Sequence, residues 1–140
     1  MTEPIKGGCM CGAVRYTCMA EPTFAAHCHC DNCRLWSGTG HSSNLAVRKS
    51  ATTVTGTPAT YVRPTDTGHT VTRSFCATCG VHLFAVYSIA PDEILLNAAS
   101  LDDLTRFKPD RVLYASRRAA WDYTDPSLAT FERDPPPHQA

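Results

Sequence analysis

The chain has 140 residues, 43% of them hydrophobic, a size typical of one domain with a modest core. Thirteen basic residues balance thirteen acidic ones, and neither sign forms a block, which argues against a nucleic-acid partner. No stretch reaches the roughly 20 apolar residues of a membrane span, and the N-terminal residues lack the apolar core of a signal peptide. We therefore expect a cytoplasmic protein with neither a membrane nor a nucleic acid as partner.

Short alternating or β-branched runs, each bounded by glycine, proline or other turn residues, predict strands rather than long helices. In chain order the predicted strands are 13–18, 42–47, 51–55, 60–63, 70–75, 81–87, 94–97 and 112–116. One short helix is predicted at 31–36, with Asp31 capping its first amides. Short strands at this spacing favour an antiparallel sandwich or a barrel-like fold.

The domain organisation is expected to be simple. The sequence has no internal repeat and no sign of a second domain, so we expect one domain over residues 1–133. Residues 134–140 read DPPPHQA and offer nothing to bury, so they are expected to form a proline-rich mobile tail.

Seven of the eight cysteines fall into three short clusters. In a reducing compartment, clustered cysteines indicate metal ligands or catalytic groups rather than disulfides. Two pairs of cysteines make a closed tetrahedral zinc site, whereas three cysteines leave one position of a tetrahedral zinc free for water or substrate. The clusters are Cys9 and Cys11; Cys28, Cys30 and Cys33; and Cys76 and Cys79.

The two outer pairs are predicted to share one structural zinc. Cys9 and Cys11 are two residues apart, so in an extended segment both thiols point to the same side. Cys76 and Cys79 form a knuckle, in which Gly80 relieves the tight turn. Because binding of such a zinc is coupled to folding, its removal should loosen the whole domain. A redox dithiol is the alternative, but the βαβ context of that class is missing.

The middle cluster packs three thiols into HCHCDNC, where Asp31 and Asn32 make the bend that brings Cys33 round. A fourth cysteine is absent from this stretch, so the fourth zinc ligand is open. Since His29 lies between two ligands and His27 is adjacent to one, an extended segment points both side chains away from the metal. A surface or hydrogen-bonded role is favoured for the histidines. The candidate fourth ligands are His27, His29, His41, His82, Cys18 or an exogenous group.

Cys18 is the eighth cysteine and could fill the vacancy in the middle cluster. In a strand over residues 13–18 it shares a face with Val14 and Tyr16, while Cys11 belongs to the other face. It also lies about 23 Å along the strand from Cys11. A lone cysteine among apolar strand residues usually acts as a small buried hydrophobe, so we expect Cys18 in the core.

The motifs GGCMCGAVRY, HCHCDNCRLWSG and FCATCGVHLF, followed by LLNAASLDD and SRRAAW, closely resemble the glutathione-dependent formaldehyde-activating enzyme family, also called the GFA or centromere-protein-V-like domain. The resemblance runs from Gly7 to about Trp121. It implies a mainly β fold, a single antiparallel domain of the Mss4-like or β-tent type stapled by zinc. It also implies two zinc ions per chain.

For the cysteines, the resemblance implies that Cys9, Cys11, Cys76 and Cys79 bind a structural zinc and that Cys28, Cys30 and Cys33 bind a catalytic one. The family reaction is the condensation of glutathione with formaldehyde to S-(hydroxymethyl)glutathione, which implies a carbon–sulfur lyase acting on a small thiol and an aldehyde. Zinc held by three thiolates suits this chemistry, because it carries one net negative charge, accepts a fourth thiolate and favours loss of the thiol proton.

The substrate pocket is not identified by the sequence. Glutathione carries two carboxylates, so arginines near the zinc are expected. Each candidate arginine is also typical of a solvated surface residue. Trp36 and Trp121 are candidates to line the pocket and are equally well explained as core residues. The candidate arginines are Arg15, Arg34, Arg48 and Arg73.

Two other classes of function remain open. A non-catalytic, zinc-stapled binding module would tolerate a middle site filled by the protein, whereas an enzyme needs an exchangeable fourth ligand there. A redox or metal-storage protein would show reversible disulfides and sub-stoichiometric zinc.

Overall fold

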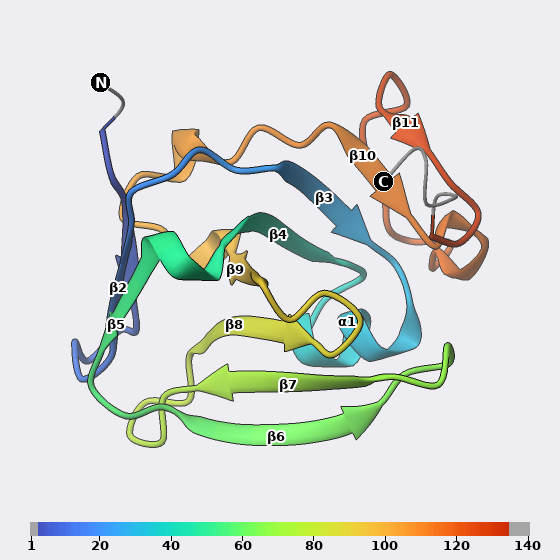
Figure 1. Cartoon of the computed structure of the whole chain (residues 1–140). Coiled ribbons are helices and arrows are strands. Elements are labelled where there is room, and N and C mark those ends of the chain that lie inside the picture. The colour runs from blue at the N-terminus through green and yellow to red at the C-terminus, as the bar shows by residue number, and fades with distance from the viewer. Residues whose placement is uncertain (1–2, 135–140) are drawn as a thin grey trace.

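The chain folds into two β-sheets in the computed structural model, which describes residues 3–134 (Figure 1). The smaller sheet has the order β1-β2-β5, with strands Ile5–Gly8, Arg15–Cys18 and Thr52–Thr55. The larger sheet has the order β11-β10-β3-β4-β9-β8-β7-β6. Its strands are, in chain order, β3 (Phe24–Cys28), β4 (Ser42–Arg48), β6 (Ala59–Pro64), β7 (Thr70–Phe75), β8 (His82–Tyr87), β9 (Glu93–Asn97), β10 (Arg111–Leu113) and β11 (Ala129–Thr130).

Helical structure is confined to short segments. The α-helix α1 spans Asp31–Ser37, and four short 3-10 helices follow it: η1 (Lys49–Ala51), η2 (Ala98–Ser100), η3 (Leu104–Arg106) and η4 (Ala115–Arg117). No helix within the described residues is long and apolar enough to cross a membrane.

The sheets are mostly antiparallel, which confirms the mainly β fold expected from the sequence. The exceptions lie at one edge, where β10 pairs in parallel with both β3 and β11. Within residues 3–134 the larger sheet is open, because β6 and β11 end it without pairing with each other. The barrel-like alternative is therefore wrong. Figure 1 shows the larger sheet extending from β6 at the bottom to β11 at the upper right, with the smaller sheet at the left.

Most predicted strands are present, and their boundaries differ by one or two residues. The run 70–75 coincides with β7, and the predicted helix 31–36 is α1 extended by one residue. The predicted strand 112–116 is wrong in its second half, where Tyr114 adopts a positive φ of 54° and the chain enters η4. Strands β1, β3 and β11 were not predicted, because glycines, alanines and short length leave little β-branched signal in them.

The core lies between the two sheets. Ile5, Val14 and Tyr16 of the smaller sheet and its turn pack in one cluster with Leu45 and Leu96 of the larger one. Each of these side chains is at most 1% exposed, so their burial supplies the main hydrophobic stabilisation that joins the sheets.

A close contact positions Tyr16 inside this core. Its hydroxyl lies 2.6 Å from Ser100 Oγ, and the hydroxyl end of the side chain lies against Gly7. A Cβ atom at Gly7 would come within 2.3 Å of the tyrosine oxygen, so only glycine fits at that point of β1. The proline-rich tail expected at residues 134–140 lies outside the described residues from 135 onward.

Candidate metal centres

The two outer cysteine pairs meet in space. The turn between β1 and β2 carries Cys9 and Cys11, and the turn between β7 and β8 carries Cys76 and Cys79. All four sulfur atoms lie within 4.8 Å of one another, and Cys11 Sγ is 3.6 Å from the sulfurs of both Cys9 and Cys76. A tetrahedral zinc with Zn–S bonds of about 2.3 Å requires sulfur separations of about 3.8 Å. The four thiols therefore fit a zinc ion.

The first pair does not lie in an extended segment, as the sequence suggested. Residues 10–11 form a turn, and Gly12 closes it with a φ of 79° while its N–H donates to the Cys9 carbonyl at 3.3 Å. A turn folds the chain back on itself, so it brings the thiols together without the alternation of a strand. The second pair is the expected knuckle, in which Gly80 has a φ of 77°.

Main-chain N–H groups point at the outer sulfurs. The N–H of Val14 donates to Cys9 Sγ at 3.3 Å, and the N–H groups of Thr78 and Cys79 donate to Cys76 Sγ at 3.4 Å. The Val14 contact lowers the pKa of the Cys9 thiol, and the N–H of Val81 lowers that of Cys79 to about 6. Hydrogen bonds of this kind stabilise thiolates, which are the form that binds zinc.

The middle cluster forms where β3 ends and α1 begins. Cys28 is the last residue of β3, Cys30 is the N-cap of α1, and Cys33 lies in its first turn, with the three sulfurs within 4.8 Å of one another. Within residues 3–134 no fourth cysteine, histidine or carboxylate joins this group. Cys30 Sγ accepts the N–H of Cys33 at 3.2 Å, so the predicted cap by Asp31 is wrong: Asp31 instead begins the helix.

The charges around the middle cluster call for a further cation. Contacts with the thiols of Cys28 and Cys30, together with the charge of Arg73, hold the pKa of Cys33 well below its usual value. The thiols of Cys30 and Cys33 raise the pKa of Cys28, because neighbouring sulfurs cannot all ionise together. A divalent cation would satisfy all three thiolates, so the donor set fits zinc.

Arg73 is the residue beside this cluster whose burial the sequence analysis missed. It was one of four candidate arginines and was expected to be solvated, yet it is only 3% exposed. Its Nη2 lies 3.7 Å from Cys33 Sγ and 3.5 Å from the Tyr87 hydroxyl, and its guanidinium lies 5.0 Å from the centre of the Trp36 ring. The burial of Arg73 could have been predicted from the alternation of side chains along β7, because Arg73 lies two residues after the buried Val71 and so on the same face.

The remaining candidate arginines and Trp121 are all less buried than Arg73. Arg15 pairs with Asp102, and Arg34 lies 3.7 Å from Asp31. Arg48 is the last residue of β4, whereas Ser42, which pairs with Cys28, is the first, so Arg48 lies at the end of the strand that is far from the middle cluster. Trp121 is 65% exposed and is not a core residue.

The other sulfur and nitrogen candidates do not complete the middle cluster within the described residues. Cys18 is fully buried in the core, as expected. The His27 ring shares a 2.9 Å hydrogen bond with Ser43 Oγ, and His82 stacks on Trp36 with ring centres 3.8 Å apart. His29 and His41 gather with Asp122 in a separate group. The expected surface or hydrogen-bonded role is wrong for His29, which is fully buried with neither ring nitrogen hydrogen-bonded among residues 3–134.

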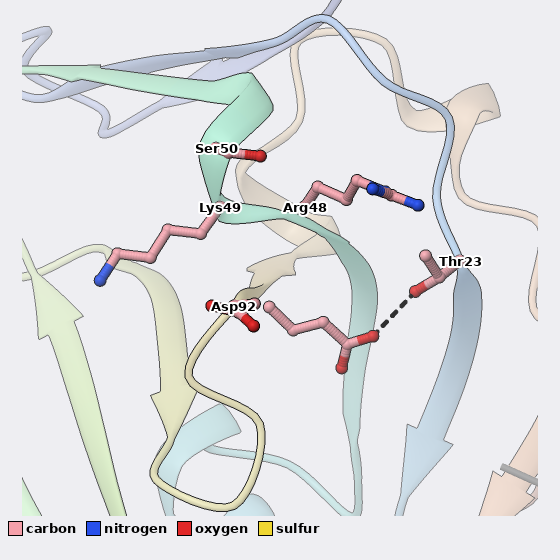
Figure 2. A pocket seen from close by; sticks show the side chains of 6 residues that line it. Thr23, Arg48, Lys49, Ser50 and Asp92 are labelled. Atoms are coloured by element: carbon pink, nitrogen blue, oxygen red, sulfur yellow. Dashed lines mark hydrogen bonds between the residues drawn. The ribbon is translucent and has the colours of Figure 1, made fainter.

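A surface pocket of about 620 Å³ lies away from the cysteines (Figure 2). Its lining comes from the far end of β4 and from neighbouring turns, and Thr23 Oγ1 donates to Glu93 Oε2 there at 3.1 Å. No cysteine borders this pocket, so it is not the space in front of either cluster. The lining residues are Thr23, Arg48, Lys49, Ser50, Asp92 and Glu93.

Comparison with known proteins agrees with the cysteine pattern. The chain is 24% identical over 93 residues to an uncharacterized lyase of Schizosaccharomyces pombe, and the match covers 66% of this chain and 65% of that relative, just under two thirds of its length. A crystal structure of a Rhodobacter sphaeroides protein, a structural genomics target, has 27% sequence identity and a TM-score of 0.55 over 69% of this chain and 87% of that one. The family model described as glutathione-dependent formaldehyde-activating enzyme matches residues 4–117. On this match, which spans both outer pairs and the middle cluster, the chain belongs to the glutathione-dependent formaldehyde-activating enzyme family.

Proposed function

We propose that the chain is a zinc-dependent carbon–sulfur lyase that cleaves, and in reverse forms, the bond between a thiol sulfur and an aldehyde carbon. The observation that carries this proposal is the middle cluster, where three thiols lie beside the buried guanidinium of Arg73. Three protein ligands leave a tetrahedral zinc one position for an exogenous group. The family description supports glutathione and formaldehyde as substrates, with S-(hydroxymethyl)glutathione as their adduct.

We also propose two zinc ions per chain, with different tasks. Cys28, Cys30 and Cys33 hold the catalytic ion. The structural ion has four thiolate ligands and ties a turn of the smaller sheet to a turn of the larger one. Its ligands are Cys9, Cys11, Cys76 and Cys79.

The condensation balances without any oxidant or reductant. The thiol gives up its proton, its sulfur forms a bond with the carbonyl carbon, and the electron pair of the carbonyl double bond moves to the oxygen, which takes up a proton. Bound zinc supplies a positive charge that favours the deprotonated form of a thiol near neutral pH. The protein must then hold the ligands, shape the site and stabilise the oxygen as it gains charge.

Arg73 and Tyr87 are suited to these last tasks. The Tyr87 hydroxyl lies 3.9 Å from Cys33 Sγ, and burial raises its pKa, so it keeps its proton and can donate a hydrogen bond to the substrate oxygen. Arg73 is the positioning residue, because its Nη2 approaches both Cys33 Sγ and the Tyr87 hydroxyl. Trp36 covers the guanidinium with its ring and forms an apolar wall next to it.

The test is exchange NMR with glutathione and isotope-labelled formaldehyde, with and without zinc-loaded protein. We expect the protein to accelerate exchange between hydrated formaldehyde and the S-hydroxymethyl carbon. Cys30→Ser should abolish the acceleration because it removes a ligand of the catalytic zinc, whereas Cys18→Ala should leave it unchanged because Cys18 lies in the core.

Exchange equal to that of the protein-free mixture, with both zinc ions in place, would overturn the formaldehyde assignment. Parallel samples with other small thiols separate the reaction from its substrate. Acceleration with another thiol but not with glutathione would support the proposed lyase reaction and exclude glutathione as its substrate. No acceleration with any thiol, on a folded protein, would leave a zinc-stapled binding module as the better account.

A further inference from the structure

A third group of metal-ligating side chains lies outside both cysteine clusters. His29 follows β3, His41 precedes β4, and Asp122 comes from the segment between η4 and β11. One ligand atom from each lies within 4.8 Å of the other two. His29 stands between Cys28 and Cys30 in the sequence but belongs to this separate group, so the chain there offers ligands to two groups.

His29 is the observation that points to a ligand. Its side chain is fully buried, yet neither Nδ1 nor Nε2 makes a hydrogen bond of good geometry within residues 3–134, although the main chain of Gly40 lies beside the ring. A buried polar group without a partner loses its hydrogen bonds to water and gains none in return, so native structures rarely keep one without a purpose. Its Nδ1 lies 3.3 Å from Asp122 Oδ2 without forming a hydrogen bond, so the two atoms are neighbours whose polar groups are not satisfied by each other.

One of the two nitrogen–oxygen distances in this group already suits a metal ion, and the other is that of a hydrogen bond. With metal–ligand bonds of about 2.0–2.1 Å, a tetrahedral zinc separates its nitrogen and oxygen ligands by about 3.3 Å. The His29–Asp122 separation already has that value. His41 Nδ1 lies 2.6 Å from the same Asp122 oxygen, so a metal would replace this one hydrogen bond and open the distance by about 0.7 Å.

The surrounding chain is built to hold the carboxylate in this position. A Cβ atom on Gly40 would come within 2.3 Å of Asp122 Cγ, so the carboxylate can occupy this position only because residue 40 is glycine. The Asp122 side chain is only 12% exposed. Arg118, the nearby cation, donates to the main-chain oxygen of Asp122 and not to its carboxylate, which His41 contacts.

We propose that His29, His41 and Asp122 bind a third divalent transition-metal ion, with zinc as its natural occupant. Two imidazoles and one carboxylate match the preferences of zinc, cobalt and nickel, whereas magnesium and calcium prefer oxygen ligands alone. Three protein ligands again leave an open position. This site is independent of the proposed lyase function, because it shares no ligand with either cysteine cluster.

Cobalt titration of protein loaded with only two equivalents of zinc, enough to fill the two cysteine sites and leave the third site empty, tests the proposal. Cobalt bound by nitrogen and oxygen gives weak visible absorption without the intense near-ultraviolet bands of cobalt–thiolate bonds, so displacement of zinc from a cysteine site is distinguishable. We expect wild type to bind one equivalent of cobalt with the first signature. His41→Gln and Asp122→Asn should each weaken this binding at least about tenfold, and zinc retention at the cysteine sites should not change.

Matched control variants are His69→Gln, in the turn between β6 and β7, and Asp92→Asn, an exposed aspartate. Both should bind the extra cobalt as wild type does. If Asp122→Asn fails to fold, cobalt binding by His41→Gln tests the third site by itself, because this variant keeps the Asp122 carboxylate packed against Gly40. Absence of sulfur-free cobalt absorption in wild type, or equal binding by wild type and His41→Gln, would overturn the third site. Formaldehyde exchange measured on the same samples reports separately on the lyase proposal.

Discussion

Arg73 gives the middle cluster its particular electrostatics. Zinc with three thiolates carries one net negative charge, and a buried guanidinium 3.7 Å from Cys33 Sγ offsets it. A buried arginine is costly unless it is paired, and its Nε has no hydrogen-bond partner among the described residues. The thiolates of the cluster are the groups that can compensate this charge.

We therefore expect Arg73→Met to weaken retention of the middle zinc by about 10- to 100-fold, as loss of a partner next to a metal ligand typically does. Zinc content after dialysis against a competing chelator measures the effect. Arg63→Met, on the neighbouring strand β6 and exposed, is the matched control and should behave as wild type. Equal zinc retention by both variants would contradict this role of Arg73.

Tyr87 is expected to act on the reaction and not on the metal. Tyr87→Phe removes the hydroxyl proposed to donate to the substrate oxygen and keeps the ring, so the exchange rate should fall by about 100-fold. Zinc content should stay at the wild-type value, which separates this variant from Arg73→Met. Tyr61→Phe, 62% exposed on β6, is the control. An unchanged exchange rate in Tyr87→Phe would exclude the tyrosine from the chemistry.

At the scale of elements, turns decide where the cysteines lie. The turn between β5 and β6 passes against the segment that carries Cys11 and Ala13. Gly56 there has a φ of 82°, and a Cβ atom would come within 2.0 Å of the Ala13 carbonyl oxygen. This contact packs the segment that follows the first cysteine pair against the turn that leads into β6 of the larger sheet.

Gly56→Ala should lower the free energy of unfolding by about 3 kcal/mol, because both a left-handed backbone and a collision with main chain must be accommodated. Gly68 has a similar φ of 84°, but no atom lies within 4 Å of its Cβ position. Gly68→Ala should therefore cost only about 1 kcal/mol. Urea unfolding of the zinc-loaded proteins compares them, and equal destabilisation would show that the close approach does not matter.

Sequence reasoning succeeded best for elements with strong local patterns. The β7 strand was predicted at its observed bounds because the β-branched run Thr70 to Thr72 begins it. The α1 helix was predicted one residue short, and from a cap by Asp31 that Cys30 provides instead. The parallel pairing of β10 with β3 and β11 could not be predicted, because it joins segments distant in the sequence. Register between such segments is set by tertiary packing and leaves no local signal.

For the candidate sites, sequence spacing predicted which cysteines gather but not what surrounds them. The outer four meet because two turns of different sheets come together, which the complementary pairs had suggested. The group formed with Asp122 was beyond reach, since the aspartate lies 81 residues from His41. The sequence named His29 and His41 only as candidate fourth ligands of the middle cluster, and nothing in it singled out Asp122 from the other acidic residues.

For the whole molecule, the outer site connects the two sheets, so its zinc should be part of the folding free energy. Apparent zinc-binding energies of about 10 kcal/mol or more match the entire stability of a typical domain, about 5–15 kcal/mol. Of the two cysteine-bound zinc ions, progressive chelation should remove the middle one first with circular dichroism unchanged, and the chain should unfold as the outer one leaves. Cys76→Ser should impair folding, whereas Cys30→Ser should melt near the wild-type temperature. Unfolding that accompanies the first zinc lost would contradict this order.

The central claim is that the middle site accepts an outside thiol and the outer site does not. NMR of the protein reconstituted with an NMR-active cadmium isotope tests this claim most directly, because each metal gives its own signal. Glutathione should shift the signal that is missing in Cys30→Ser and leave unmoved the signal of the four-thiolate site formed by Cys9, Cys11, Cys76 and Cys79. A middle-site signal that does not move at saturating thiol, or a shift of the outer-site signal in its place, would contradict the account.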